Sequence, residues 1–265
     1  MVHHRVDLQD CSIFYQQGGS LEGATPILLL HGWGISTEPY QELLQLLAQQ
    51  HSVIAPDLPG FARSPYPTVI PSYDAYAQIL VAFLDKLNLS QVHLVGHSFG
   101  GGIAIALAAL AGDRIKSLIL LDSTGIPTES IPVLIPRRAI EMTAQLLSPR
   151  LHLKLVDIPQ VFIHNLVFNP GQVIHALFLS LQGDLSGLFP SVQSPCLLLW
   201  SEQDWTIPLS VAQEMSDKIS HARLVLVQEG FHEWALWYPE KLVAIVMEFV
   251  QQVESRGAIA AHAPD

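Results

Sequence analysis

Residues 96–100 carry the pattern G-x-S-x-G, in which a serine stands between two glycines. A strand-like run at 91–95 precedes the pattern, and an alanine-rich, helix-like stretch follows it at 101–110. A strand, a sharp turn and a helix together hold a serine hydroxyl exposed at a helix N-terminus, and the flanking glycines allow the strand and the helix to pack closely. The sequence therefore predicts Ser98 as a nucleophile.

A serine hydroxyl is a weak nucleophile at neutral pH, so it needs a base to take its proton and an acid to orient that base. In a parallel sheet such groups gather just beyond the carboxyl ends of the strands. Asp204 follows the strand-like run at 196–200, and His232 follows the next one at 222–227. The chain order Ser98, Asp204, His232 is the one expected for a catalytic triad on such a sheet, and we predict these three residues as catalytic.

Other residues compete for the same roles. Asp122 also ends a strand-like run and stays open as a second candidate for the acid. Glu202 comes two residues before Asp204 and is expected on the loop surface. Among the histidines, His97 lies inside the turn and is expected to point away from the substrate. His31 is expected to fix the backbone of its own loop.

Acyl transfer also needs two backbone amides that stabilise the negative charge developing on the carbonyl oxygen. The amide of Phe99 directly follows Ser98 and lies at the start of a helix, where the helix dipole favours an anion. The loop H-G-W-G at 31–34 follows a buried strand, and its Trp33 amide is the predicted second donor. We therefore predict Trp33 and Phe99 as the oxyanion hole and as residues that contact the substrate.

Apolar runs and helical periodicities alternate along the chain around these residues. An antiparallel hairpin is expected at 4–17, strands at 26–30, 52–57, 91–95, 117–122, 196–200 and 222–227, and helices at 39–50, 73–87, 101–110, 211–219 and 239–253. Such alternation predicts an α/β fold with a mostly parallel central sheet and helices on both faces.

The alternation stops at residue 123 and resumes near residue 191. The chain between them is helical in pattern, apolar and interrupted by prolines, which predicts a helical insertion at 123–190. The core domain would then comprise residues 1–122 and 191–254. Residues 255–265 are small and polar-leaning and predict a flexible C-terminal tail.

The composition excludes several classes of protein. The chain has 265 residues, which suits one large α/β domain with an insertion, and its formal charge of −11 argues against a nucleic-acid partner. No cluster of histidine, cysteine and carboxylate residues has metal-ligand spacing, so neither a metal nor a cofactor is expected. Cys11 and Cys196 lie far apart in the sequence and are expected to be free thiols.

The sequence also bears on location. With 49% hydrophobic and 14% charged residues, the chain can bury a core and keep apolar surface for a ligand. Its longest apolar run, at 103–111, is far too short for a transmembrane segment. The N-terminus has no apolar signal core, so a cytoplasmic location is expected.

Taken together, these motifs resemble those of the α/β-hydrolase superfamily. The stretches that carry the resemblance are residues 30–34, 56–61, 96–101, Asp204 and 230–232. The resemblance covers nearly the whole chain outside the insertion, and it implies the α/β-hydrolase fold, a Ser–His–Asp triad and a lid at 123–190 that decides the substrate. Within the superfamily, the H-G-W-G and D-L-P-G-F stretches resemble the carboxylesterases that demethylate pimeloyl carrier-protein esters in biotin synthesis. One position departs from the family pattern P-G-x-G-x-S, because Ala62 stands where the second glycine is usual.

The resemblance implies a carboxylic ester hydrolase that works through an acyl-enzyme and acts on a small-molecule ester. The apolar insertion favours a medium or long acyl chain. Arg137 and Arg138 are neighbours within the insertion. They are predicted either to bind the substrate, through a phosphate or an acidic acyl carrier protein that docks on the lid, or simply to be solvated.

Other reactions of the same three residues stay open. Thioesterases, carbon–carbon bond hydrolases and cofactor-free perhydrolases of this superfamily use the same triad. A haloalkane dehalogenase is disfavoured because it would need an aspartate at position 98. A non-catalytic protein that uses the pocket as a receptor is disfavoured by the intact Ser98, Asp204 and His232.

Overall fold

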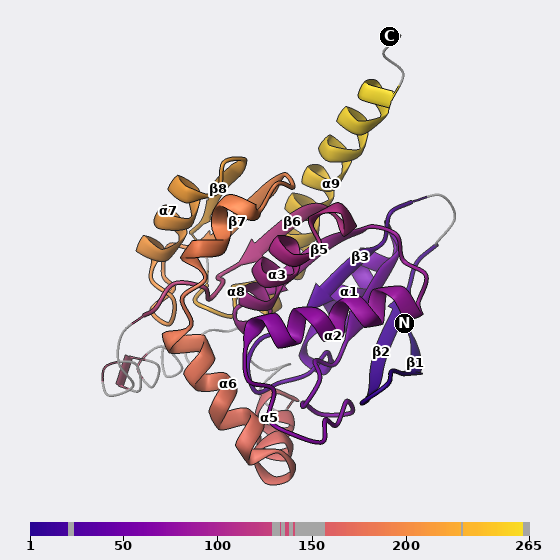
Figure 1. Cartoon of the computed structure of the whole chain (residues 1–265). Coiled ribbons are helices and arrows are strands. Elements are labelled where there is room, and N and C mark those ends of the chain that lie inside the picture. The colour runs from indigo at the N-terminus through magenta and orange to yellow at the C-terminus, as the bar shows by residue number, and fades with distance from the viewer. Residues whose placement is uncertain are drawn as a thin grey trace.

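The centre of the molecule is an eight-stranded sheet with the strand order β1-β2-β4-β3-β5-β6-β7-β8 (Figure 1). The computed structural model describes residues 1–20, 24–128, 133, 136–137, 140, 157–228 and 230–261. The strands are β1 (Val2–Asp7), β2 (Ser12–Gly18), β3 (Ile27–Leu30), β4 (Val53–Pro56), β5 (Val92–His97), β6 (Ile115–Leu121), β7 (Cys196–Ser201) and β8 (Ala222–Val227).

Most of the sheet is parallel, as the sequence predicts. β1 and β2 form the expected antiparallel hairpin, and β2 pairs antiparallel with β4. From β4 onward every neighbouring pair is parallel, through β3, β5, β6 and β7 to β8. The carboxyl ends of six strands therefore lie along one edge of the sheet.

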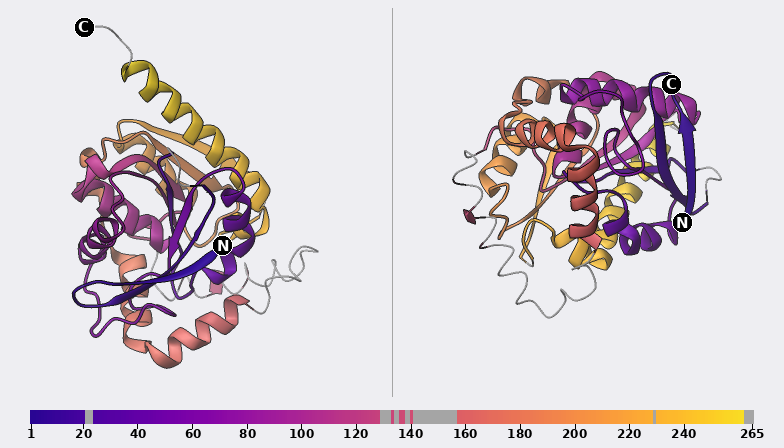
Figure 2. Two further views of the ribbon diagram at one scale, coloured as in Figure 1. Left: turned by 90° about the vertical axis from the view of Figure 1, so that its right-hand side faces the viewer. Right: turned by 90° about the horizontal axis from the view of Figure 1, so that it is seen from below.

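Helices cover both faces of the sheet (Figures 1 and 2). They are η1 (Glu38–Tyr40), α1 (Gln41–Ala48), α2 (Tyr73–Lys86), α3 (Phe99–Leu110), η2 (Gly112–Arg114), α5 (Asp157–Phe168), α6 (Pro170–Gln182), η4 (Ser186–Ser191), α7 (Leu209–Lys218), α8 (Trp234–Trp237) and α9 (Pro239–Ala261). Helices α2, α3 and α7 pack in one apolar cluster, and α1, α8 and α9 pack in the other.

The strands have unbroken apolar runs because helices cover both faces of the sheet, and successive side chains of a strand point to opposite faces. In β3, Leu28 and Leu30 belong to the cluster with α2 and α3, whereas Ile27 and Leu29 belong to the cluster with α1 and α9. A strand buried on both faces must be apolar at every position. The predicted α/β-hydrolase fold class, with its mostly parallel sheet and helices on both faces, is confirmed.

The chain between β6 and β7 corresponds to the predicted lid at 123–190. Its described part contains α5 and α6, which lie together at the bottom of Figure 1. α5 contacts η1, and α6 contacts α3. Because η1 follows β3 and α3 follows β5, these two helices lie over the carboxyl edge of the sheet.

The C-terminal helix is longer than its sequence pattern predicts. α9 ends at Ala261, although the apolar periodicity ends near residue 253 and residues 255–265 are predicted as a tail. Alanine has the highest helix propensity, so the alanines that end α9 favour helix without contributing to an amphipathic pattern. Within the described residues, no helix combines the length and the apolar character needed to cross a bilayer.

Candidate active site

Ser98 lies in the sharp turn between β5 and α3. Its φ of +54° and ψ of −118° place a non-glycine residue in a strained conformation. The turn depends on the flanking glycines, since a Cβ on Gly96 would lie 2.6 Å from the Gly100 carbonyl oxygen. A Cβ on Gly100 would lie 2.4 Å from the carbonyl oxygen of Leu30, so α3 approaches the end of β3 too closely for any side chain there.

The structure brings Ser98, His232 and Asp204 into one hydrogen-bonded chain. The His232 Nε2 atom lies 2.9 Å from the Ser98 Oγ atom, and the His232 Nδ1 atom lies 2.8 Å from the Asp204 Oδ2 atom. All three side chains are nearly buried, so little water competes for these contacts. Because a carboxylate only accepts hydrogen bonds, Nδ1 carries the proton and Nε2 is free to accept the serine proton.

Backbone amides hold the Asp204 carboxylate in place. Its Oδ1 atom accepts hydrogen bonds from the amides of Thr206 at 2.8 Å and Ile207 at 2.7 Å, which leaves Oδ2 for His232. Glu202, the neighbouring acid, is exposed on the loop as predicted.

The two predicted oxyanion donors lie beside Ser98. Phe99 is the first residue of α3, and Gly32 lies so close that a Cβ on it would be 3.5 Å from the Ser98 Cβ atom. Trp33 follows Gly32 directly. Among the described residues, no acceptor is bonded to the backbone amide of Trp33 or Phe99. Unpaired amides at a nearly buried serine are available to a negatively charged oxygen.

A polar relay connects the loop of Gly32 to the backbone of His232. The Gly32 amide donates to the Tyr40 hydroxyl at 3.1 Å, and that hydroxyl lies 2.6 Å from the His97 Nδ1 atom. The His97 Nε2 atom donates to the His232 carbonyl oxygen at 3.1 Å, and the two rings lie 5.4 Å apart. His97 thus supports the triad from behind, a role that its place in the motif alone does not reveal.

The predicted role of His31 is confirmed. Its Nδ1 atom donates to the Gly32 carbonyl oxygen at 2.8 Å, and its Nε2 atom accepts from the Leu58 amide at 2.8 Å. The side chain is fully buried, and this burial lowers the pKa of His31. The neutral imidazole therefore joins the loop after β3 to the loop after β4.

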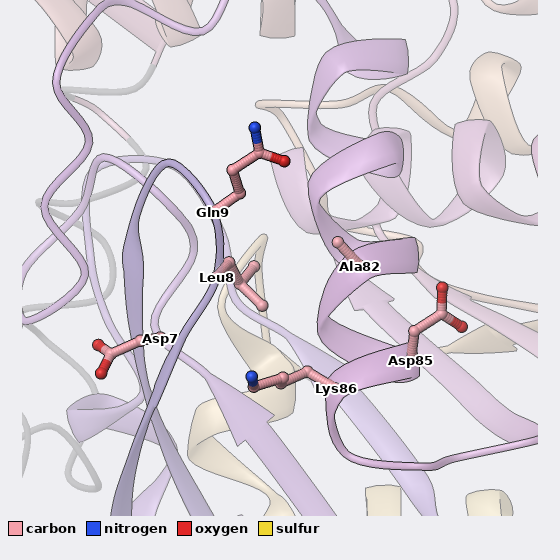
Figure 3. A pocket seen from close by; sticks show the side chains of 6 residues that line it. All are labelled: Asp7, Leu8, Gln9, Ala82, Asp85 and Lys86. Carbon is pink, nitrogen blue, oxygen red and sulfur yellow. The ribbon is translucent and has the colours of Figure 1, made fainter.

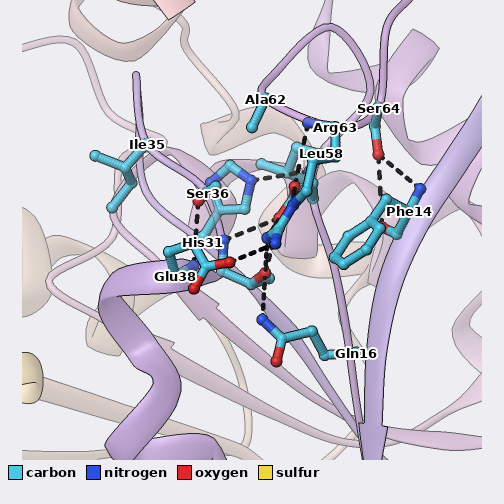
Figure 4. A network of polar contacts seen from close by, with 12 residues as sticks. Phe14, Gln16, His31, Ile35, Ser36, Glu38, Leu58, Ala62, Arg63 and Ser64 are labelled. Atoms are coloured by element: carbon cyan, nitrogen blue, oxygen red, sulfur yellow. Dashed lines mark hydrogen bonds and ion pairs between the residues drawn. The ribbon is translucent and has the colours of Figure 1, made fainter. Parts of the chain in front are cut away.

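Behind the same loop, the half-buried Arg63 forms an ion pair with the buried Asp57. Figure 4 shows Arg63 within this polar network. The Arg63 Nε atom lies 2.7 Å from an Asp57 oxygen, and the Thr37 amide donates to Asp57 at 3.0 Å. Arg63 also pairs with Glu38. Burial alone would raise the pKa of Asp57, but the hydrogen bond and charge of Arg63 outweigh it and lower that pKa. Through its bond to Thr37, the ion pair fixes the C-terminal part of the loop after β3.

The predicted lid is joined to the same loop by Asn165 of α5, whose side chain is fully buried. Its Nδ2 atom donates to the carbonyl oxygens of Gly34 at 2.9 Å and Ile35 at 3.2 Å. Its Oδ1 atom accepts from the Ala62 amide at 2.6 Å. In addition, the Trp33 indole donates to the Val173 carbonyl oxygen of α6 at 2.8 Å.

Of the other predicted residues, Asp122 bonds to neither Ser98 nor His232 among the described contacts. Its oxygens accept from the Ser201 amide at 2.9 Å and from the Trp234 indole. Arg137 is exposed, and Arg138 lies outside the described residues, so the predicted carrier-protein contact stays a prediction.

The cavities described on the surface lie elsewhere. One of about 590 Å³ is lined by the β1–β2 hairpin and α2, where Leu8, Gln9 and Ala82 face one another (Figure 3). Within the described part of the chain, no three histidine, cysteine or acidic residues form a group that could hold a metal ion. Cys11 and Cys196 are free thiols, and burial raises the pKa of Cys196 to about 12.

Comparisons with known proteins bear on the fold. A family profile described as the alpha/beta hydrolase fold matches residues 25–142. The dihydrolipoyllysine-residue acetyltransferase component of the acetoin cleaving system of Pseudomonas putida is 36% identical over 113 residues, which is 43% of this chain and only 30% of that protein. A 2-hydroxy-6-oxononadienedioate/2-hydroxy-6-oxononatrienedioate hydrolase of Pseudomonas putida is 27% identical and matches over 91% of this chain and 92% of its own.

Solved structures show the same fold. A thermophilic esterase from Thermogutta terrifontis superposes with a TM-score of 0.76 at 24% identity, over 94% of this chain and 99% of its own. At this identity the likeness concerns the fold and not the substrate.

Proposed function

Because this chain belongs to the α/β-hydrolase superfamily, we propose that it is a serine hydrolase that cleaves carboxylic esters through an acyl-enzyme. One observation carries the proposal. The strained turn presents the Ser98 hydroxyl to His232 at 2.9 Å, while Asp204 orients the other side of the imidazole at 2.8 Å. A weak nucleophile, a base and an orienting acid in this order are what acyl transfer to serine requires.

In the first step, the Ser98 oxygen attacks the ester carbonyl carbon while His232 takes the hydroxyl proton. Asp204 stabilises the imidazolium that forms, and the Trp33 and Phe99 amides bind the oxyanion of the tetrahedral intermediate. The carbon–oxygen bond to the alcohol then breaks, and His232 gives its proton to the departing alkoxide. In the second step, water loses a proton to His232, attacks the acyl-enzyme and releases the acid, and the proton returns to Ser98.

We propose an apolar acyl group for the substrate. The support comes from aromatic side chains where the predicted lid meets the oxyanion loop, with the rings of Trp33 and Phe162 only 5.3 Å apart. An apolar wall at this point favours a hydrocarbon chain over a charged group. We also propose that the acyl group is carried by an acidic acyl carrier protein that binds at Arg137 and Arg138. Charge reversal at both arginines would then raise KM for carrier-linked substrates but not for small esters.

Hydrolysis of a carbon–carbon bond is the second candidate. Its support is the relative from Pseudomonas putida that is named as a hydrolase of 2-hydroxy-6-oxo dienedioates and that matches over 91% of this chain. The same three residues would serve, with a carbon leaving group in place of the alcohol. Activity on a vinylogous diketone and none on esters would favour this candidate.

Substitution of the nucleophile tests the proposal. Ser98→Ala is expected to lower kcat by about 10⁶-fold on p-nitrophenyl esters of two to sixteen carbons while the protein stays folded. Ser117→Ala, a buried serine at the other end of the sheet that bonds to His93, serves as the matched control and is expected to keep wild-type kcat. A fluorophosphonate is expected to label the wild-type protein and the control, but not Ser98→Ala. Wild-type ester hydrolysis by Ser98→Ala would refute the assignment of the nucleophile.

A further inference from the structure

Asp122 is a buried carboxyl group that the proposed reaction does not use. It directly follows β6, and its side chain is fully buried. Its φ of +42° lies in the left-handed region, where glycine is favoured. Burial of an ionisable side chain and an unfavourable backbone conformation both cost free energy. This cost indicates that the contacts of Asp122 have a specific role.

The contacts of Asp122 reach both loops that carry the candidate acid and base. One carboxyl oxygen accepts from the amide of Ser201, the last residue of β7, at 2.9 Å. The other accepts from the indole of Trp234, which follows His232 by two residues and begins α8. One side chain therefore bridges the end of β7 and the start of α8.

Each of these anchor points is close in the chain to a triad residue. The amide of Asp204 donates to the carbonyl oxygen of Ser201 at 3.2 Å, so the position of Ser201 sets the start of the acid loop. The hydroxyl of Ser201 donates to the Gly230 carbonyl oxygen at 3.0 Å, which ties the same residue to the histidine loop. Movement of either anchor would change the distance between Asp204 and His232.

Asp122 also lies close enough to Asp204 to be affected by its charge, and a nearby like charge disfavours the charged form of a buried carboxyl group. Asp204 has three donors for its negative charge: the amides of Thr206 and Ile207 and the His232 imidazole. For Asp122, burial and then the charge of Asp204 raise the pKa well above its usual value. Asp122 therefore favours its neutral form beside the Asp204 carboxylate.

We propose that Asp122 is a positioning residue that ties the Asp204 loop to the His232 loop through its bonds to Ser201 and Trp234. This inference rests on the proposed function, because the spacing of the loops matters for the reaction only if Ser98 is the nucleophile. Asp122 touches no reacting atom and acts through Asp204 and His232.

The test compares Asp122→Ala and Asp122→Asn with Ser117→Ala, which removes a buried hydrogen bond of 2.7 Å at the opposite end of β6. The readouts are the rate of fluorophosphonate labelling and the kcat and KM for a p-nitrophenyl ester. We expect Asp122→Ala to lower kcat and the labelling rate about 100-fold with KM nearly unchanged, the loss typical of a displaced catalytic group. Asn is neutral and keeps one of the two acceptors that bond to Ser201 and Trp234, so Asp122→Asn is expected within about tenfold of wild type.

A second measurement keeps the inference testable if Asp122→Ala does not fold. A carboxyl group whose pKa is raised by folding contributes full stability below its unfolded pKa of about 3.9, and this contribution is lost as the pH rises. The free energy of unfolding of Asp122→Asn, relative to wild type, should therefore increase as the pH is raised from about 4.

Different results separate the two proposals. If the wild type is not labelled at all, the proposed function fails. If the wild type is labelled and Asp122→Ala reacts at the wild-type rate, the positioning role is wrong. Labelling of Asp122→Asn as slow as that of Asp122→Ala, or a stability difference independent of pH, would show that Asp122 does not act as a neutral acid.

Discussion

Ala62→Gly should stabilise this protein, although glycine usually weakens a fold. Residue 62 lies in the loop after β4, at the position where the family pattern has its second glycine. The φ of Ala62 is +45°, in the left-handed region. In this conformation the Cβ atom crowds the backbone, and a glycine removes the crowding.

The magnitude follows from two opposing terms. A left-handed conformation costs an L-residue about 1–2 kcal/mol, which the substitution would recover. The greater freedom of glycine in the unfolded chain offsets about 0.4–1 kcal/mol of that gain. The amide of residue 62 still donates to Asn165, because this bond uses only the backbone. We therefore expect a net stabilisation of about 0.5–1 kcal/mol, or a rise in Tm of about 1–3 °C for a chain of this size.

Thermal and urea denaturation followed by circular dichroism measure this difference. The matched control is Ala82→Gly, in the exposed middle of α2. There glycine relieves no strain, so the control should be less stable than wild type by about 1 kcal/mol. If Ala62→Gly is destabilised as much as Ala82→Gly, the argument from backbone strain is wrong.

Further substitutions test the polar contacts around the oxyanion loop. Asn165→Ala leaves a buried amide and two carbonyl groups without their partner, and should lower the free energy of unfolding by about 2–3 kcal/mol and also lower kcat. Because the pKa of Asp57 is lowered, its ion pair stabilises the fold above about pH 4, and this stabilisation is lost as the pH falls. The free energy of unfolding of Arg63→Ala, measured over the same acid range, should therefore fall less than that of wild type. The lowered pKa of His31 means that stability falls as the pH drops below about 6.5, and denaturation of His31→Gln between pH 7 and 5 should lack this component.

The sheet and the order of the triad were predictable because they leave strong local signals. A strand buried on both faces needs four or more consecutive apolar residues, and 27–30 and 196–200 show such runs. The nucleophile turn needs glycine at 96 and 100 because backbone atoms lie within 3 Å of any Cβ there. Since His232 and Asp204 each follow a parallel strand, the sheet itself brings them to the same edge as Ser98.

The polar residues that support the site leave no such signal. Tyr40, His97 and Asn165 are single polar residues whose bonding partners are mostly backbone atoms far along the chain. Asn165, for example, bonds to Gly34 and Ala62, more than one hundred residues away. A bond to a backbone group places no demand on the side-chain type of the partner, so the sequence contains no matching pair of residues to recognise.

Strand β6 shows how position in the fold decides what a buried polar residue does. Ser117 lies near its amino end and Asp122 directly follows its carboxyl end, and both side chains are fully buried. In the sequence each is a polar residue beside an apolar run. Ser117 bonds to His93 within the sheet, whereas Asp122 reaches Ser201 and Trp234 beside the triad. The direction of the strand separates the two: parallel strands collect their functional groups at the carboxyl edge, so loss of the Ser117 bond should affect stability and loss of the Asp122 bonds should affect the reaction.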